Sequence, residues 1–380
     1  MARPKPNPRR IEQRARSSRV RRVVAAAIAA ALIAIVAWFA LRDREDLRAR
    51  AERAERAGRH SEALELRREW IRSGRARSRD RVALARSALA VDRAREAESA
   101  LREAVRLDPA EFEAWHLLIE LLRIERRELD AESAGIAALE AVPTDRRTGI
   151  LRDLTLATIY RDTTIDARSE TIARRTLERW IASDPEDDDA RAALALRQAI
   201  DPIPGDPDRD LRIAELEARL AVAPEHRGLR EALIVSLADA GEIDRGRALL
   251  DAWPAGDDPR RDRLRARFDL DYDRKPEEAA EALGRVVARI PHDWRSHYHR
   301  ARALRAVGRI DDANRAADMA RRLRERLDPA RLAARLVEDL REPVRSPALR
   351  DLAELCRELG LSRLAEEWER LAARRGSNPT

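Results

Sequence analysis

The pattern of apolar and polar positions divides the chain into one unbroken apolar run and a long periodic part. Residues 23–41 read VVAAAIAAALIAIVAWFAL and contain no charged side chain. A helix of these 19 residues rises about 28 Å, close to the ~30 Å thickness of a hydrocarbon core. We therefore expect a retained transmembrane helix at residues 23–41. A cleaved signal peptide and a buried helix of a soluble protein are the alternatives.

Positive charge gathers in front of this run. Residues 1–22 hold nine Lys or Arg side chains against one acid, Glu12, so this tail carries +8 and the other 358 residues carry −1 of the net +7. The positive-inside rule predicts a cytoplasmic N-terminus and an extracytoplasmic C-terminal part in a bacterial inner membrane. Because the positive charge is not spread along the rest of the chain, it does not indicate a nucleic-acid partner.

Beyond the apolar run, apolar positions recur at helical spacing and also at a longer period. Two sets of residues lie 34 positions apart and agree in three of four residue types. The sets are Ala97, Leu101, Ala104 and Pro109, then Ala131, Gly135, Ala138 and Pro143. Pro185, Pro224, Pro259 and Pro291 continue the register at intervals of 32 to 42 residues.

A second marker is a Gly followed five residues later by a small residue. The pairs are Gly58 and Ala63, Gly241 and Gly246, Gly308 and Ala313, and Gly360 and Ala365. Gly can adopt the left-handed conformation that ends the first helix of a pair, and the small residue lets the second helix approach. Together the markers predict about nine helix pairs, at residues 44–77, 78–111, 112–145, 146–187, 188–226, 227–259, 260–292, 293–328 and 346–375.

Trp115 and Leu118 open the second of the two sets at the spacing Trp-x2-Leu. With the small residues and the closing Pro, this pattern resembles the tetratricopeptide repeat (TPR) family over about residues 44–375. The resemblance implies an all-α fold, an α-solenoid of stacked helical hairpins in a superhelix, with a concave groove that binds a protein or peptide. The expected organisation is a basic tail (1–22), a transmembrane helix (23–41), repeats (44–200), a Pro-rich loop or hinge (201–208), repeats (209–375) and a polar tail (376–380).

Composition agrees with this fold and excludes others. Aromatic residues make up 3% of the chain and Gly and Pro are few, which excludes a β-sandwich or barrel. A single Cys excludes a disulfide framework and a Cys-rich metal site, and Cys356 falls on an apolar helical stripe where we expect it to be buried. Trp70, Trp180 and Trp253 take the register place of Ala104 and Ala138, so we expect them to fill widened gaps between helices.

The best candidate for chemistry is the segment PHDWRSHYHR, which contains His292, His297 and His299. Three His side chains could bind a metal ion, but His297 and His299 are two residues apart and would point to different sides of a helix. We therefore expect a non-catalytic protein with no cofactor and no metal. A metal-dependent enzyme that uses this cluster is the less favoured alternative.

The outward face of the first helix in each pair predicts a partner groove. Its expected lining residues are Arg79, Val82, Arg86, Glu113, His116, Glu120, Arg123, Arg261, Leu264, Phe268, Tyr272, Arg295, Tyr298 and Arg302. The resulting hypothesis is a membrane-anchored scaffold that recruits other proteins at the bacterial cell envelope. A cytoplasm-facing adaptor of the same fold is the alternative, and a homo-oligomer stays open because Ala26, Ala30 and Ala34 form a row of small residues.

Overall fold

The computed structural model describes residues 47–74, 76–144, 146–159, 167–200, 207–328 and 346–376. The predicted transmembrane helix at 23–41, the basic tail, most of the Pro-rich loop and nearly all of the polar tail lie outside these ranges. Within them, no helix combines the length and the apolar character needed to cross a membrane.

All regular structure in the described ranges is helical. Ala, Leu, Arg and Glu dominate these segments, and they are the residues that favour helix most strongly. A helical segment at 47–56 comes first. The elements that follow are α2 (His60–Arg72), α3 (Ser78–Leu89), α4 (Ala94–Leu107), α5 (Phe112–Ile124), α6 (Glu128–Ala141), α7 (Arg147–Ile159), α8 (Ala167–Ser183), α9 (Asp188–Ile200), α10 (Arg209–Val222), α11 (Arg227–Asp239), α12 (Ile243–Asp251), α13 (Pro259–Asp271), α14 (Pro276–Arg289), α15 (Trp294–Ala306), α16 (Ile310–Arg326), α18 (Ser346–Glu358) and α19 (Ser362–Gly376).

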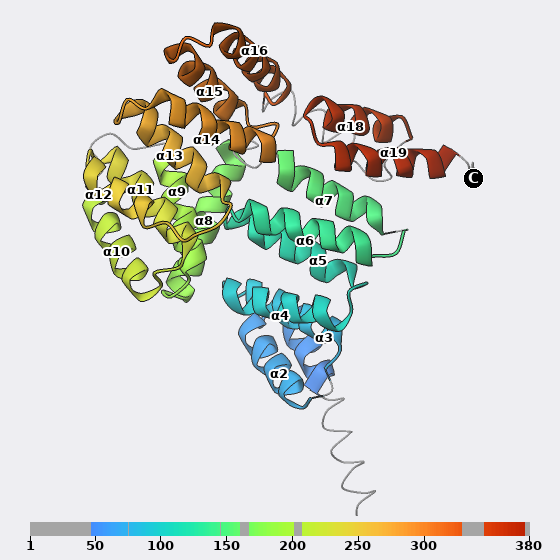
Figure 1. The fold of residues 1–380 in the computed structure, drawn as a ribbon. Coiled ribbons are helices and arrows are strands. Elements are labelled where there is room, and N and C mark those ends of the chain that lie inside the picture. The colour runs from blue at the N-terminus through green and yellow to red at the C-terminus, as the bar shows by residue number, and fades with distance from the viewer. Residues whose placement is uncertain are drawn as a thin grey trace, which may run out of the picture. The chain divides into compact units, whose positions relative to one another are not determined.

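These helices follow the predicted repeat register. From α3 onward, the first helix of each unit begins within one residue of the start expected from the Pro and Gly markers. Helices of one unit pack against each other in the pairs α3–α4, α5–α6, α11–α12, α13–α14, α15–α16 and α18–α19, as Figure 1 shows. Most of the described chain from α3 onward is thus an array of helical hairpins, the fold that the TPR resemblance implies, but the predicted pair at 146–187 is not among them, because α7 and α8 pack against other helices.

Tight turns within the pairs use a left-handed residue two positions before the first residue of the second helix. Gly58, Gly241, Gly308 and Gly360 have φ between +72° and +82°, as expected from the sequence. Their small partners five residues later are buried or in close contact: a Cβ on Gly246 would lie 3.0 Å from the ring of Phe268. Three other pairs carry a larger residue at the same place, namely Asp92, Arg126 and Arg274, with φ of +55° to +61°.

The position of Arg274 provides a stability prediction. Its side chain is exposed, and a left-handed conformation is strained for any residue with a Cβ. We expect Arg274→Gly to raise the free energy of unfolding by about 0.5–1 kcal/mol, because relief of strain exceeds the added freedom of the unfolded chain. Urea titration measures the change. Gly308→Ala is the matched control and should lower stability, and an unchanged or lower stability of Arg274→Gly would contradict the explanation.

Contacts divide the described chain into two units, one up to Ala76 and one from Arg77 onward. The second unit contains α3 to α19, and residues of both predicted halves, 44–200 and 209–375, belong to it. Its core is rich in Ala, as in the cluster from α13 to α16.

Trp180 and Trp253 are buried, as expected for gap-filling side chains, whereas Trp70 in the first unit is only half-buried. Cys356 is fully buried, and burial raises the pKa of its thiol to about 12.

The second unit departs from a simple array at α7. Besides its neighbours α5 and α6, α7 contacts α19 from the last hairpin, whereas α8 packs against α9. The indole Nε1 of Trp368 donates a 3.0 Å hydrogen bond to Oγ1 of Thr155, and both side chains are fully buried. At the rim, Arg363 forms a 2.8 Å ion pair with Glu140. The last hairpin therefore closes back on a helix near the middle of the sequence.

Candidate functional site

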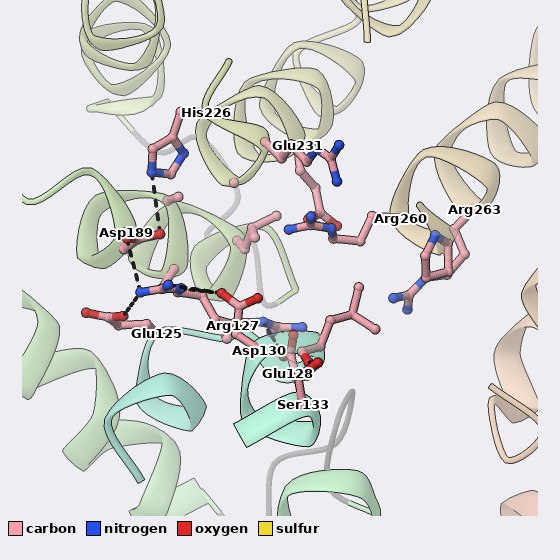
Figure 2. Close-up of a pocket in the computed structure, with 18 of the residues that line it drawn as sticks. Glu125, Arg127, Glu128, Asp130, Ser133, Asp189, His226, Glu231, Arg260 and Arg263 are labelled. Atoms are coloured by element: carbon pink, nitrogen blue, oxygen red, sulfur yellow. Dashed lines mark hydrogen bonds and ion pairs between the residues drawn. The ribbon is translucent and has the colours of Figure 1, made fainter. Parts of the chain in front are cut away.

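A cavity of about 460 Å³ lies in the second unit, between the α5–α6 turn and the N-terminal ends of α9, α11 and α13 (Figure 2). These three helices are the first helices of successive pairs, the elements that line the groove of a TPR solenoid. We call this space the Arg127 cavity. Its charged lining residues are Glu125, Arg126, Arg127, Glu128, Asp130, Asp189, Glu225, Arg227, Glu231, Arg260 and Arg263.

Small residues bring α9 and α11 together at this cavity. A Cβ on Gly228 would lie 3.3 Å from the Cβ of Ala192 and 3.3 Å from the ring of His226. Ala192, Ala193 and Leu196 of α9 form one apolar part of the lining, to which Leu129, Pro259 and Ile290 add. Because α9 and α11 approach closely through small residues, these residues offer little surface to a partner. The charged side chains of the lining are therefore the groups that can recognise one.

Arg127 joins the turn to the helices. Its Nη1 lies 2.8 Å from Glu98, 3.0 Å from Glu125 and 3.2 Å from Asp189, and its Nη2 lies 3.0 Å from Asp130. One guanidinium thus contacts four carboxylates, three of them on α4, the turn and α9. Such charge-assisted contacts in a poorly hydrated place are stronger than those of exposed ion pairs.

His226 holds Asp189 from the other side, as Figure 2 shows. The Nδ1 of His226 accepts a 3.1 Å hydrogen bond from the backbone N–H of Leu229, so in the neutral ring Nε2 carries the proton. That Nε2 lies 3.4 Å from Oδ1 of Asp189. Burial favours a higher pKa for Asp189, but the hydrogen bond from His226 and the charge of Arg127 outweigh it and hold this pKa below its usual value.

The carboxyl of Glu125 is only partly compensated by its contact with Arg127. Oε2 contacts Arg127, while the buried Oε1 has no hydrogen-bond partner in the described part of the chain. Burial raises the pKa of Glu125 well above its ordinary value, and the nearby charge of Asp189 adds to the effect, against the opposing charge of Arg127. The cluster therefore holds more acceptors than Arg127 satisfies.

The opposite side of the cavity is held by ion pairs on α11 and α13. Arg260 contacts Asp258 through two hydrogen bonds of 3.0 and 2.9 Å. Glu231 lies 4.0 Å from Arg260, and burial raises the pKa of this carboxyl. This side is therefore richer in Arg than the side around Glu125.

Carboxylates of Glu98, Glu125 and Asp189 come within 4.8 Å of one another, a spacing that could suit a metal ion. However, the Nη1 atom of Arg127 lies within 3.2 Å of one oxygen of each group. A cation is thus already supplied by the chain itself, and the cluster is built around a guanidinium.

None of the groove residues predicted from the sequence lines the Arg127 cavity. Several nevertheless lie together on neighbouring first helices. Arg86 on α3 lies 3.2 Å from Glu113 on α5, and Arg302 on α15 lies 3.3 Å from Asp271 on α13. The exposed members of the predicted set are Arg79, Arg86, Tyr272, Arg295, Tyr298 and Arg302, and the half-buried ones are Glu113, His116, Glu120, Arg123 and Arg261.

For Val82, Leu264 and Phe268 the predicted exposed position is wrong, because all three side chains are buried. Leu264 and Phe268 belong to a cluster with Trp253 and Leu250, in which α13 packs against α11 and α12. The helical phase placed these residues on the outward face, but apolar side chains there gain more by packing against the preceding pair than by remaining in water.

His116 is the predicted residue with the most distinct chemistry. Its Nδ1 lies 2.6 Å from Oδ2 of Asp153 on α7, and its ring stacks on Phe112. The hydrogen bond to Asp153 raises the pKa of His116, although burial opposes this. The pair joins α5 to α7 and remains accessible at the surface, since His116 is only half-buried.

The three His residues considered for a metal site do not converge. The Nε2 of His292 bonds to the carbonyl of Thr158 at 2.8 Å, and that of His297 to the carbonyl of Pro291 at 3.0 Å. His299 instead contacts Arg302. Each ring has a different partner, so the described geometry does not support the alternative of a metal-dependent enzyme at this cluster.

No protein-family model matches the chain, and no curated protein matches it in sequence. Among solved structures, a tetratricopeptide repeat protein from Parabacteroides merdae is 14% identical over 64% of this chain and 92% of its own, with a TM-score of 0.29. A human IFIT1 dimer with m7Gppp-AAAA is 19% identical over 79% of this chain and 68% of its own, with a TM-score of 0.35. YrrB, a TPR protein with an unusual peptide-binding site, is 15% identical over 49% of this chain and 89% of its own, with a TM-score of 0.22.

Proposed function

We propose that this protein is a membrane-anchored scaffold of the TPR type that binds a segment of another protein at the Arg127 cavity and on the adjoining first helices. The observation that supports a binding role is the cavity itself. Three successive first helices contribute its wall, and charged side chains at fixed positions make up much of its lining. A peptide segment could use the small apolar floor for close approach and the charged rim for selectivity.

Site-specific photo-crosslinking tests this proposal. A photo-reactive amino acid is placed at Ser133 or Glu225, two exposed residues that line the cavity. The matched control position is Asp244 on α12, whose side chain is 97% exposed and outside the cavity. We expect the same protein adduct from Ser133 and Glu225 and none from Asp244. Equal adducts from all three positions, or none from the cavity, would contradict the site.

The anchoring part of the proposal rests on the uncharged run at 23–41 and the basic tail before it. We expect the full chain to remain in the membrane pellet after a carbonate wash, and a chain without residues 1–41 to be released. Release of both forms would rule out the anchor.

We place the repeats outside the cytoplasm of a bacterial cell, from the count of basic residues on either side of the run. Protease added to spheroplasts should then digest the repeats. Full protection, together with digestion after lysis, would instead establish the alternative of a cytoplasm-facing adaptor.

A further inference from the structure

The α5–α6 turn lies against the first helices in the place where a partner segment would bind. Two charged contacts attach it to α9: Arg127 reaches Asp189 at 3.2 Å, and Arg197 donates a 3.3 Å hydrogen bond to the carbonyl of Ile124. The α5–α6 turn thus occupies part of this face, as a bound peptide would. The side chain through which the turn contacts α9 therefore indicates which chemical group the face can bind.

The accepted group is a guanidinium. The side chain of Arg127 is only 19% exposed, and its planar fork meets carboxylates on two edges. Asp189 is held in place by His226, and this carboxylate remains ionised. The contact from His226 therefore positions this receiving carboxylate independently of Arg127.

Acceptors at this place exceed the donors that Arg127 supplies. Four carboxylates contact it, of which Glu98 also pairs with Arg102 at 2.7 Å. The buried Oε1 of Glu125 has no hydrogen-bond partner in the described ranges. An unsatisfied buried carboxyl oxygen beside a cavity of about 460 Å³ favours a second cationic hydrogen-bond donor, whose charge would also oppose the raised pKa of Glu125.

We propose that Asp189 and the adjoining face of α9 and α11 recognise an arginine of the partner segment, and that Arg127 competes for this position within the chain. This inference rests on the proposed function and deepens it by naming the partner as a segment that presents arginine. A metal ion is not the inferred ligand, because Arg127 Nη1 already contacts all three clustered carboxylates. An arginine side chain can exchange for another arginine side chain without a change in coordination chemistry.

Removal of Arg127 should open the position to an arginine added in trans. The probe is a capped tripeptide Ala-Arg-Ala, with Ala-Lys-Ala and Ala-Gln-Ala as controls, added to the full chain in detergent micelles. For Arg127→Ala we expect a saturable rise in thermal midpoint with Ala-Arg-Ala. Its Kd should be at least tenfold lower than for the unchanged chain, with weaker binding of Ala-Lys-Ala and none of Ala-Gln-Ala.

Three further variants make the test specific. Asp189→Asn in the Arg127→Ala background should abolish binding of Ala-Arg-Ala. Arg245→Ala, which removes an Arg that pairs with Glu217 and Glu242 away from the cavity, should behave as the unchanged chain. If Arg127→Ala does not fold, Arg127→Gln combined with Glu125→Gln removes the cation together with one acid, and the same binding is expected.

The inference is overturned if neither opened variant binds Ala-Arg-Ala more tightly than the unchanged chain does, or if Asp189→Asn leaves binding intact. Its failure is distinct from failure of the proposed function. Adducts from Ser133 and Glu225 without tripeptide binding would leave the scaffold role and remove the arginine preference. Tripeptide binding without any adduct would support the arginine preference and contradict the binding of a protein segment at the cavity.

Discussion

Replacement of Trp368 by Ala is expected to lower the free energy of unfolding by about 3–5 kcal/mol, the largest effect we anticipate for a single substitution. The indole is fully buried and forms the hydrogen bond to Thr155 that joins α19 to α7. Its removal leaves a cavity and an unpaired hydroxyl. The change is measured by urea titration and by hydrogen exchange at α7 and α19, which should both lose protection.

Two control variants separate the contribution of the buried ring from that of the hydrogen bond. Trp368→Phe retains most of the ring but not the N–H donor, so its cost should be about 1–2 kcal/mol. Trp294→Ala removes a half-buried indole from α15 and should cost less than Trp368→Ala. If Trp368→Ala were no more harmful than Trp294→Ala, the contact between α7 and α19 would not stabilise the unit.

The second large effect is a pH dependence centred on Asp187. This residue precedes α9, where its Oδ1 accepts a 3.0 Å hydrogen bond from the N–H of Ala190, while its buried Oδ2 has no partner among the described residues. Burial raises the pKa of Asp187 to about 6, and the adjacent charge of Asp189 contributes. The carboxyl is thus more easily protonated in the folded chain than in the unfolded one.

The sign of the effect follows from this difference. Below about pH 4 the carboxyl is protonated in both states and costs nothing. Between about pH 4 and 6 the folded chain binds more protons than the unfolded chain, so stability contributed by this group falls as pH rises. Above the folded pKa of about 6 the cost is complete.

Asp187→Asn should therefore stabilise the chain at pH 7.5 and have little effect at pH 4.5. A pKa difference of about 2 corresponds to about 3 kcal/mol, and burial of the amide N–H₂ group offsets part of it, so we expect a gain of about 2 kcal/mol. Urea titrations at the two pH values measure the difference between variant and unchanged chain. Asp189→Asn is the control of opposite sign, because the lowered pKa of Asp189 stabilises the folded chain at neutral pH. A gain for Asp187→Asn that is the same at both pH values would contradict the assignment.

The repeat register was predictable from the sequence because its signals are local. A turn of a few residues needs a left-handed position, which Gly58, Gly241, Gly308 and Gly360 provide, and the sequence therefore marks where a second helix begins. The same logic misses Arg126 and Arg274, which take this conformation without being Gly. Their pairs were placed instead by Pro and by the 34-residue period.

Exposure along the first helices was less predictable. Phe268 and Tyr272 lie four residues apart on the predicted groove face, yet Phe268 is fully buried and Tyr272 is exposed. The difference comes from the neighbouring pair, which covers one part of the helix and not its end. Helical phase alone contains no information about that neighbour.

The Arg127 cavity could not be located from the sequence, because it joins residues from distant parts of the chain. Arg127 and Asp189 are 62 positions apart, and neither stands out in a chain that contains 77 Lys and Arg residues and 70 Asp and Glu residues. The one local signal is the run Glu125-Arg126-Arg127-Glu128 in a short turn. Such charged runs occur on many solvated helix faces. Only the packing of the turn against α9 shows that this run belongs to a cavity.

Closure of the last hairpin on α7 has a consequence for the order in which the protein is made. Thr155 and Trp368 are 213 positions apart. At roughly 5–20 residues per second, a ribosome needs roughly 10–40 s to extend the chain from one to the other. During that interval the apolar side of α7 has no α19 to cover it, so a growing chain should depend on a chaperone, and a product truncated before α18 should aggregate.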